Sequence, residues 1–552
     1  MKILKPVFYT AVAGLLLTSC KSISSLPVPV GSDVVVNATA KKGKLSDTEK
    51  DNWQHLDLVT DSIPGMSVNK AYEFLKGKKG IEVIVGVVDS GTDLKHEDLV
   101  DVAWVNKKEI PGNGIDDDKN GYIDDINGWN FLGKSYKEHL EYERILMNPS
   151  IADAETLAEV KKFYNDKIEK AKKAGETLLT NKNRYEQLLQ GVKNTDEAFA
   201  KHFGKKDYTT EEVLAIKTED ESLLKNIAIA KRMFSFGLPS LADAKKELEG
   251  GINYFIKQLE SNKKLISGES LKTDYRTAVG DNAYDIKDKP GSGDGNTGHS
   301  IKDEAHGSHV SGIIGATRNN GKGMNGVANN VKIMAVRSVS DGDEYDKDVA
   351  LAIRYAVDNG AQVINMSFGK SYTANKKMVD DAMIYAQSKG VLLVHAAGND
   401  ARNIDTTDNF PTDILLSGTR VNNLICVGAS TISTKKKLPA GFSNYGNENV
   451  DIFAPGLDVV STTVESEYEI SQGTSFSAPV VSGVAALVWS YYPDLTATQM
   501  KEILIKSATN MGRKRVFIPG MGKKKTRFRE LSVSDGVVNT YNAFVLAAEM
   551  SK

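Results

Sequence analysis

The chain has 552 residues, of which 40% are hydrophobic and 26% charged; this usage is ordinary for globular proteins and excludes collagen-like, mucin-like and wholly disordered chains. The 70 Lys and Arg nearly cancel the 72 Asp and Glu, so the formal charge of -2 does not indicate a nucleic acid or another polyanion as partner. Two cysteines, Cys20 and Cys426, exclude a disulfide framework, and at about 150 residues per domain the length allows three or four domains.

The first twenty residues have the pattern of an export signal. A short positive end precedes an apolar run over residues 7–17, which is too short to span a bilayer. Residues 17–20 (LTSC) resemble a bacterial lipobox, and this resemblance implies cleavage before Cys20 and acylation of that cysteine. The alternative is an ordinary secretory signal with an incidental cysteine. Because each buried methylene contributes about 0.8 kcal/mol, multiple acylation implies a stable membrane anchor.

We therefore expect residues 1–19 to be a lipoprotein signal peptide and residues 20–52 to be a flexible tether. The tether is rich in Ser, Val and Lys and has no periodicity. The predicted location is that of an exported bacterial lipoprotein anchored to a membrane, the outer membrane on its periplasmic or cell-surface side. Cys426 lies in the apolar run LICVG and is predicted to be a small hydrophobic residue of a buried strand.

From Trp53 onward, short apolar runs alternate with helical patterns. Runs typical of fully buried parallel strands lie at residues 82–88, 331–336, 362–366, 391–396 and 422–427. The helical patterns, for instance at residues 348–359 and 377–389, end near a glycine. This alternation predicts an α/β fold with a doubly wound parallel sheet, in which ligands bind at the carboxyl ends of the strands.

Residues 134–298 interrupt this alternation. They are rich in Lys, Glu, Ala and Leu, and Leu157, Tyr164 and Ala171 fall on one helical face. Helix starts are indicated after Thr209 and Ser240, each followed three residues later by an acid. We expect a mainly helical insertion that divides the α/β domain into residues 53–133 and 299–546. A lid, a partner-docking arm and simple decoration are all compatible with this pattern.

Three short glycine-bearing segments carry candidate chemistry. They are residues 85–93 (VGVVDSGTD), 306–312 (HGSHVSG) and 473–479 (GTSFSAP). Taken singly, each has an ordinary explanation: Asp89 as a turn or cap former, and Ser475 as a helix cap. His306 and His309 have no nearby Cys or acid to complete a zinc-like spacing.

Together, Asp, His and Ser in this chain order on a parallel α/β sheet resemble the subtilisin-like serine proteases, the subtilases. The resemblance covers about residues 53–130 and 299–546. Supporting segments are residues 326–328 (GVA), 365–369 (NMSFG), 396–399 (AAGN), 442–446 (FSNYG) and 454–456 (APG). The resemblance implies a serine endopeptidase that hydrolyses peptide bonds in proteins through an acyl-enzyme, without a catalytic cofactor.

The resemblance also assigns catalytic roles. Ser475 is the nucleophile, and His306 is the base because an imidazole titrates near neutral pH. Asp89 would hold the imidazole in the right tautomer and stabilise the imidazolium. Asn399 matches the position whose side-chain amide forms the oxyanion hole with the Ser475 backbone N–H. His309 is the second His of the family motif, and we expect a structural role for it.

Two segments are expected to bind the substrate strand between them by β-augmentation. They are Ser367, Phe368 and Gly369, and Ala396, Ala397 and Gly398. Their small residues would form the walls of the first specificity pocket, whose floor the motifs do not identify. The competing hypothesis is a non-catalytic lipoprotein that keeps the fold and binds peptides or a partner; the intact Asp89, His306, Ser475 and Asn399 argue against it.

A carboxylate-rich loop, residues 116–125 (DDDKNGYIDD), is a candidate calcium site. Counted from its first residue, acids or amides fall at positions 1, 3, 5 and 9 with Gly at 6, as in an EF-hand loop, but position 12 is Asn127 rather than Glu. The candidate ligands are Asp116, Asp118, Asn120 and Asp124. The family resemblance adds Asp98 as a second structural-calcium position. The alternative is a carboxylate-rich turn without an ion.

Two basic runs lie near the C-terminus, at residues 513–515 and 523–527. Pro519 and Gly520 between them indicate an exposed hairpin or loop. This pattern favours a solvated charge run over a polyanion site.

Overall fold

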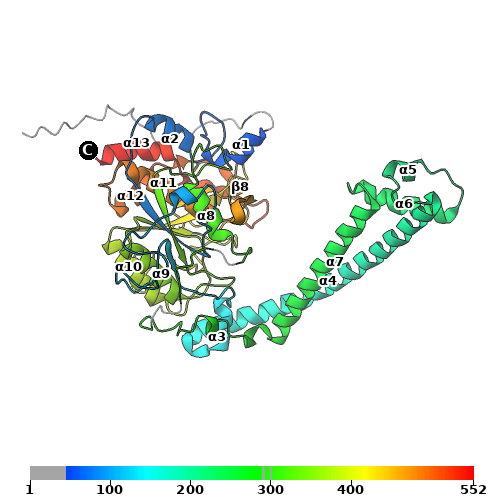
Figure 1. Cartoon of the computed structure of the whole chain (residues 1–552), viewed down its shortest axis with the longest axis horizontal. Helices are drawn as coiled ribbons and strands as arrows, with labels where there is room; N and C mark the ends of the chain where they lie inside the picture. Colours follow the sequence, from blue (N-terminus) through cyan, green and yellow to red (C-terminus); the bar gives the residue numbers. More distant parts are fainter. Residues whose placement is uncertain (1–40, 42–44, 289–292, 299–300) are drawn as a thin grey trace, which may run out of the picture.

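The structure is a computed structural model that describes residues 41, 45–288, 293–298 and 301–552 (Figure 1). The predicted signal peptide, Cys20 and most of the predicted tether lie outside the described residues. The described chain becomes regular at α1 (Asp47–Asp51) and α2 (Val68–Leu75). Among the described helices, none combines the length and the apolarity that crossing a bilayer requires.

A nine-stranded sheet forms the centre of the molecule. Its order is β10-β13-β7-β6-β5-β4-β1-β3-β2, and every neighbouring pair is parallel except β10 and β13. The strands are β1 (Val83–Asp89), β2 (Gly128–Asn130), β3 (Val331–Arg337), β4 (Val363–Met366), β5 (Leu392–Ala396), β6 (Leu424–Ser430), β7 (Ile452–Pro455), β10 (Thr509–Asn510) and β13 (Gly536–Val537). All five strands expected from apolar runs are present.

Helices cover both faces of this sheet (Figure 1). One core contains α2, α8 (His306–Gly315), α11 (Thr474–Tyr491), α12 (Ala497–Lys506) and α13 (Thr540–Met550); the other contains α9 (Asp346–Asp358) and α10 (Lys376–Ser388). Successive residues of β1 serve the two cores in turn, with Val87 in the first and Val88 in the second. A strand buried on both faces needs apolar residues throughout, which explains its continuous apolar run. The predicted doubly wound α/β fold is confirmed.

The segment predicted to be a helical insertion contains α3 (Glu141–Met147), α4 (Ala154–Phe203), α5 (Thr210–Ala215), α6 (Glu221–Ser235) and α7 (Leu241–Ser267). The long helices α4 and α7 pack against each other and project from the α/β part as an arm, with α5 and α6 at the far end (Figure 1). The expected caps are formed: Thr209 accepts from the Glu212 N–H, and Ser240 accepts from the Asp243 N–H. The far end of the arm has its own small apolar core, which includes Phe199.

Two small hairpins complete the described elements, β8 (Val459–Thr462) with β9 (Tyr468–Ser471), and β11 (Arg515–Phe517) with β12 (Lys525–Arg527). Cys426 lies buried in β6, as its apolar neighbours predict. Burial and the nearby charge of Asp451 raise the pKa of its thiol, which therefore stays protonated.

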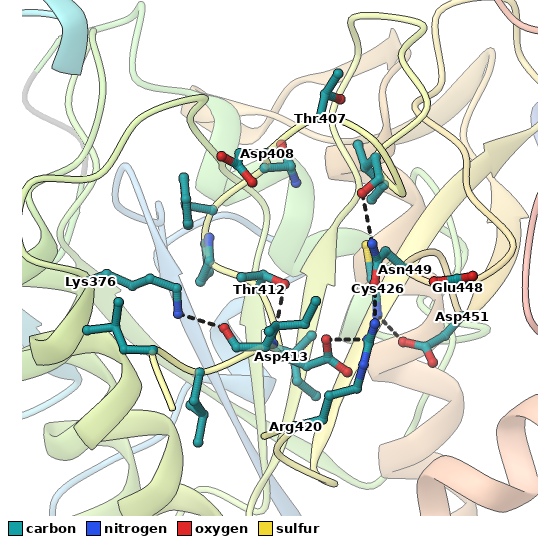
Figure 2. Close-up of a pocket in the computed structure, with 18 residues that line it drawn as sticks. Lys376, Thr407, Asp408, Thr412, Asp413, Arg420, Cys426, Glu448, Asn449 and Asp451 are labelled. Atoms are coloured by element: carbon teal, nitrogen blue, oxygen red, sulfur yellow. Dashed lines mark hydrogen bonds and ion pairs between the residues drawn. The ribbon is translucent and has the colours of Figure 1, made fainter. Parts of the chain in front are cut away.

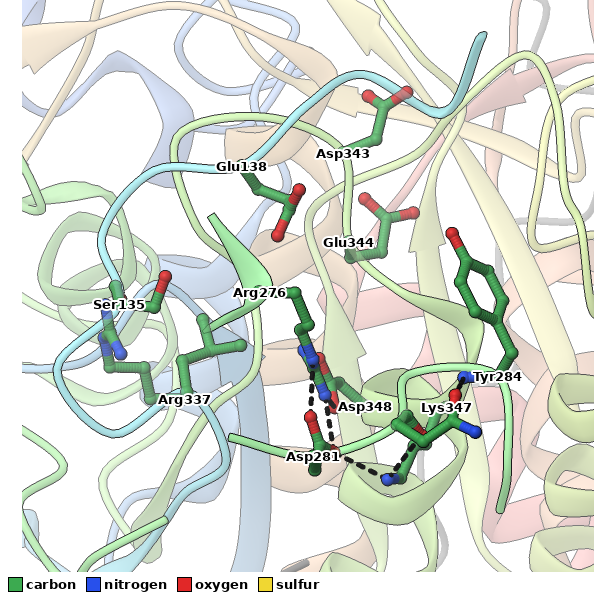
Figure 3. A network of polar contacts seen from close by, with 12 residues as sticks. Ser135, Glu138, Arg276, Asp281, Tyr284, Arg337, Asp343, Glu344, Lys347 and Asp348 are labelled. Atoms are coloured by element: carbon green, nitrogen blue, oxygen red, sulfur yellow. Dashed lines mark hydrogen bonds and ion pairs between the residues drawn. The ribbon is translucent and has the colours of Figure 1, made fainter. Parts of the chain in front are cut away.

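Buried charges join the base of the arm to the α/β part (Figure 3). Arg276, which follows α7, donates to both carboxylate oxygens of Asp281 at 2.6 and 2.7 Å and to those of Asp348 in α9 at 2.5 and 2.9 Å. The fully buried Lys347 Nζ lies 2.6 Å from Asp281 Oδ2. These ion pairs therefore hold the segment that follows α7 against the first turn of α9.

A second group of buried charges holds the outgoing chain of the arm. Arg144 of α3 donates to the backbone oxygen of Glu344 at 3.0 Å and pairs with Glu141. Lys370 Nζ lies 3.0 Å from Glu141 and 2.9 Å from Asp346. Lys370 directly follows the expected substrate-binding segment, so the arm's base is anchored next to that segment.

Replacing Arg276 with Met should strongly destabilise the protein. The substitution leaves the buried Asp348 carboxylate without its cation and Asp281 with Lys347 alone, and breaking a buried ion pair in this way costs about 3 to 5 kcal/mol. Urea unfolding followed by circular dichroism measures the change. The matched control is Lys172→Met, which removes an exposed pair with Glu169 (side chains 54% and 72% exposed) and should cost less than about 0.5 kcal/mol. Equal unfolding midpoints for the two variants would contradict the proposed anchoring role.

Candidate active site

Asp89 and His306 meet at the carboxyl edge of the sheet. Asp89 is the buried last residue of β1, and His306 is the first residue of α8. Asp89 Oδ1 lies 2.7 Å from His306 Nδ1 and also accepts from the Ser90 N–H at 2.8 Å. The motif glycine after the histidine is required here, because a Cβ on Gly307 would lie 2.1 Å from the Gly91 oxygen.

The surroundings of His306 favour its protonated form. Burial acts to lower the pKa of the imidazole, but the charge of Asp89 and the hydrogen bond to it outweigh burial and raise the pKa above its ordinary value. The His306 side chain is still 37% exposed, so a substrate can reach it. His309 differs: burial and the charge of His306 lower its pKa to about 3, so it stays neutral.

The ring of Phe476 packs against both histidines. Its centroid lies 5.3 Å from that of His306 and 4.4 Å from that of His309. Phe476 directly follows Ser475 in the first turn of α11. This packing brings the first turns of α8 and α11 together, and Ser475 with them.

The start of α11 is tied to Asn399. The Thr474 N–H and hydroxyl donate to Asn399 Oδ1 at 2.9 and 3.1 Å, which turns the side-chain amide so that its nitrogen faces away from them. A Cβ placed on Gly473 would lie 3.5 Å from Asn399 Nδ2 and 3.7 Å from the Ser475 nitrogen. The two N–H donors therefore lie close to the same point beside Gly473.

The two expected substrate-binding segments leave neighbouring strands. Strands β4 and β5 pair in parallel, so Ser367 to Gly369 and Ala396 to Gly398 emerge side by side. Ser367, Ala396 and Ala397 are buried, whereas Phe368 and Gly398 are half-buried and Gly369 is exposed. Ser367 Oγ donates to the Ser475 oxygen at 2.7 Å, which fixes the first segment against α11.

Asn409 lies between these segments. Its Oδ1 would be 3.2 Å from a Cβ on Gly398 and 3.6 Å from one on Gly369. Phe410 exchanges two backbone hydrogen bonds with Lys370 at 2.9 and 3.1 Å and so holds Asn409 in place. Sequence reasoning missed this residue, because only the contact between distant segments distinguishes it.

Behind Asn409 lies a cavity of about 260 Å³ (Figure 2). Arg420 crosses it, donating to Asp413 at 2.7 Å and to Asn449 at 2.6 Å. Asn409 and Phe410 both line this cavity, so it borders the floor of the substrate-binding region.

A group of three carboxylates lies in the acidic loop. Glu109, Asp116 and Asp118 each offer an oxygen, and these oxygens all lie within 4.8 Å of one another. Three hard oxygen ligands at this spacing fit the coordination that calcium prefers. Asp116 and Asp118 are two of the expected ligands, and Glu109 lies outside the expected set.

Asn120 and Asp124, the other expected ligands of this loop, are engaged by the chain itself. The Asp124 carboxylate accepts from the N–H groups of Gly112 and Gly114 at 2.8 and 2.9 Å. Asn120 Oδ1 accepts from the Tyr122 N–H at 2.8 Å. Asp116 also accepts from the Asn120 and Gly121 N–H groups, so the whole loop folds around its own backbone.

Asp98, the second expected calcium position, is fully buried. Its carboxylate accepts from the side-chain amide of Asn320 and from the Tyr468 hydroxyl, the latter at 2.9 Å. Neutral donors therefore occupy both of its oxygens.

Comparison with known proteins identifies the family. The model of the subtilase family matches residues 80–522, so the chain belongs to this family. It is 41% identical over 186 residues to the thermophilic serine proteinase of Bacillus sp. (strain AK1), covering 34% of this chain and 42% of that protein. It is 38% identical over 211 residues to subtilisin DY of Bacillus licheniformis, covering 38% of this chain and 71% of that protein. A solved cold-adapted subtilisin-like serine proteinase aligns at 29% identity over 42% of this chain and 74% of its own, with a TM-score of 0.32.

Proposed function

We propose that the protein is a serine endopeptidase that hydrolyses peptide bonds in proteins through an acyl-enzyme on Ser475. The observation that carries this proposal is the 2.7 Å contact between Asp89 and His306, with Ser475 and Asn399 at the adjoining start of α11. Membership of the subtilase family and the serine proteinases among its relatives support it.

In the proposed reaction His306 Nε2 accepts the Ser475 hydroxyl proton while the oxygen attacks the peptide carbonyl carbon. The tetrahedral oxyanion accepts hydrogen bonds from the Ser475 N–H and Asn399 Nδ2. The imidazolium, stabilised by Asp89, then protonates the leaving amine, and the peptide bond breaks to leave the acyl-enzyme. Water, deprotonated by His306, hydrolyses the ester and restores Ser475.

The substrate would bind as an extended strand between the segments 367–369 and 396–398. The exposed Gly369 and half-buried Gly398 leave their backbone open to such a strand. Asn409 would meet the side chain that enters the first specificity pocket, and its amide would favour residues that accept or donate a hydrogen bond there.

We also propose that Cys20 carries the lipid that anchors the exported protein to a membrane. The lipobox-like residues 17–20 after an apolar run support this proposal. The anchored enzyme would act on proteins or peptides close to that membrane.

A fluorophosphonate probe should label the protein on Ser475. Such probes react only with an activated serine, so Ser475→Ala should abolish labelling. The matched control is Ser477→Ala, the same change two residues further on, where the hydroxyl donates to the Ala454 oxygen; this variant should still be labelled. A folded parent protein that is not labelled would favour the non-catalytic, peptide-binding hypothesis.

The dependence of kcat/KM on pH should report the ionisation of His306. The base must be neutral to accept a proton, so a raised pKa means that kcat/KM falls as the pH drops through a value above the ordinary 6.5. Asp89→Asn removes the charge that raises this pKa, so the acid limb should move to lower pH, and kcat should fall by about 10^4 as in another triad.

The control for this profile is His309→Asn. Because the pKa of His309 is about 3, its replacement should leave the midpoint of the acid limb in place. An acid limb that moves in this variant but not in Asp89→Asn would contradict the assignment of His306 as the base.

We propose Glu109, Asp116 and Asp118 as the ligands of a structural calcium ion. Binding to the folded state alone contributes RT ln(1 + [L]/Kd), so a chelator should lower Tm by roughly 5 °C. Asp116→Asn should reduce this shift, whereas Asp124→Asn, which alters a carboxylate outside the group of three, should keep it. An unchanged Tm in the parent protein would exclude calcium at this loop and at Asp98.

A further inference from the structure

The β11–β12 hairpin and the neighbouring loop 433–437 form a strongly basic surface, here called the basic platform. Its cations are Lys435, Lys436, Lys437, Lys514, Arg515, Lys523, Lys524, Lys525 and Arg527. Among the described residues, no ion pair involves any of them, although Arg529 beside the hairpin pairs with Glu530 at 3.1 Å.

The fold holds these cations close together. Arg515 lies directly opposite Arg527 in the antiparallel ladder, and like charges in that position destabilise a hairpin. The amine of Lys436 and its charge lower the pKa of Lys525, as expected for cations on neighbouring segments. An anion bound between these side chains would relieve the repulsion.

The two parts of the basic platform are fixed to each other. The Phe517 N–H donates to the Lys436 oxygen at 2.8 Å, and Lys514 Nζ donates to the Thr434 oxygen at 3.0 Å. Val516, between Arg515 and Phe517, is fully buried and anchors the hairpin to the core. An open surface depression of about 560 Å³ lies beside the loop and the start of the hairpin; it is lined by the lysines of the loop, by Lys514 and Arg515, and by Ser433 and Thr434.

The turn of the hairpin lies next to the proposed oxyanion hole. A Cβ on Gly520 would lie 2.7 Å from Ala401 Cβ, and the Gly520 N–H donates to the Gly441 oxygen at 3.0 Å. Ala401 is only two residues beyond Asn399. The turn of the hairpin therefore lies close to the chain segment that carries Asn399.

We propose that the basic platform is a second binding site that takes an acidic segment of the protein substrate, outside the cleft. This inference rests on the proposed endopeptidase function. A substrate held in the cleft presents its flanking residues to the platform at high effective concentration, so that even weak carboxylate contacts add affinity. The contact of the hairpin turn with Ala401, two residues beyond Asn399, favours a peptide of the substrate over an anionic lipid surface as the occupant.

Binding is tested first without catalysis, on the folded Ser475→Ala protein. A fluorescent peptide of ten glutamates should bind, with an affinity that falls as salt rises, whereas a peptide of ten glutamines should not. The platform variant K436Q/R515Q/K525Q/R527Q should weaken binding at least about tenfold. The control K161Q/K162Q/K170Q/K173Q removes the same charge from exposed lysines of α4 and should bind like Ser475→Ala.

Several results would overturn the inference. The first is that the glutamate peptide does not bind to the Ser475→Ala protein. The second is that the platform and control variants bind the glutamate peptide equally weakly. Vesicles of phosphatidylglycerol that bind through the platform while the glutamate peptide does not would assign the surface to a lipid instead.

Cleavage is tested with substrates that share one cleavable sequence. Each carries a tail of six glutamates or of six glutamines, and the tail is placed either before or after that sequence. The glutamate tail on one side should raise kcat/KM roughly tenfold in the parent protein, and the platform variant should lose this preference. Equal kcat/KM for both tails on both sides would overturn the second-site role. Absence of cleavage of every substrate would instead refute the endopeptidase proposal, and the binding result would stand separately.

Discussion

The site depends on one contact, that between Asp89 at the end of β1 and His306 at the start of α8. The two residues are 217 positions apart in the sequence, and the whole arm lies between them. The chain must leave the sheet after β1, build α4 and α7, and return to within hydrogen-bond distance of its departure point. Everything that fixes the base of the arm therefore also fixes the imidazole relative to its carboxylate.

The buried charges at the base of the arm meet this requirement in a particular way. Ion pairs in a protein interior gain little net stability, because desolvation offsets most of their attraction, but they tolerate few alternative arrangements. Arg276 and Lys370 each bridge acids from the arm side and from the α9 side. Burial raises the pKa of Glu344 to about 8, so this group holds a proton near neutral pH and the network carries less negative charge than its acids suggest.

Short sequence patterns predicted the fold well, because strands and helix starts depend on residues that are close together in the sequence. The strands β1 and β3 to β6 are continuous apolar runs, and the helix starts at Thr209 and Ser240 depend on side chains three residues away. Asn409 could not be found this way, since it gains its position only where Gly369 and Gly398 converge. The acidic loop shows the same limit: Glu109 joins Asp116 and Asp118 from outside the EF-hand spacing.

The near-neutral net charge illustrates how composition and structure answer different questions. A total of -2 predicts that no long-range field steers a polyanion to the protein as a whole. Exposed charges are screened beyond about 8 Å at physiological salt, however, so a ligand responds to the charges within that distance rather than to the sum. The runs at 513–515 and 523–527 are each short in sequence, and the hairpin places them together beside a third run at 435–437. The fold thus concentrates cations next to the cleft where sequence shows only three separate solvated runs.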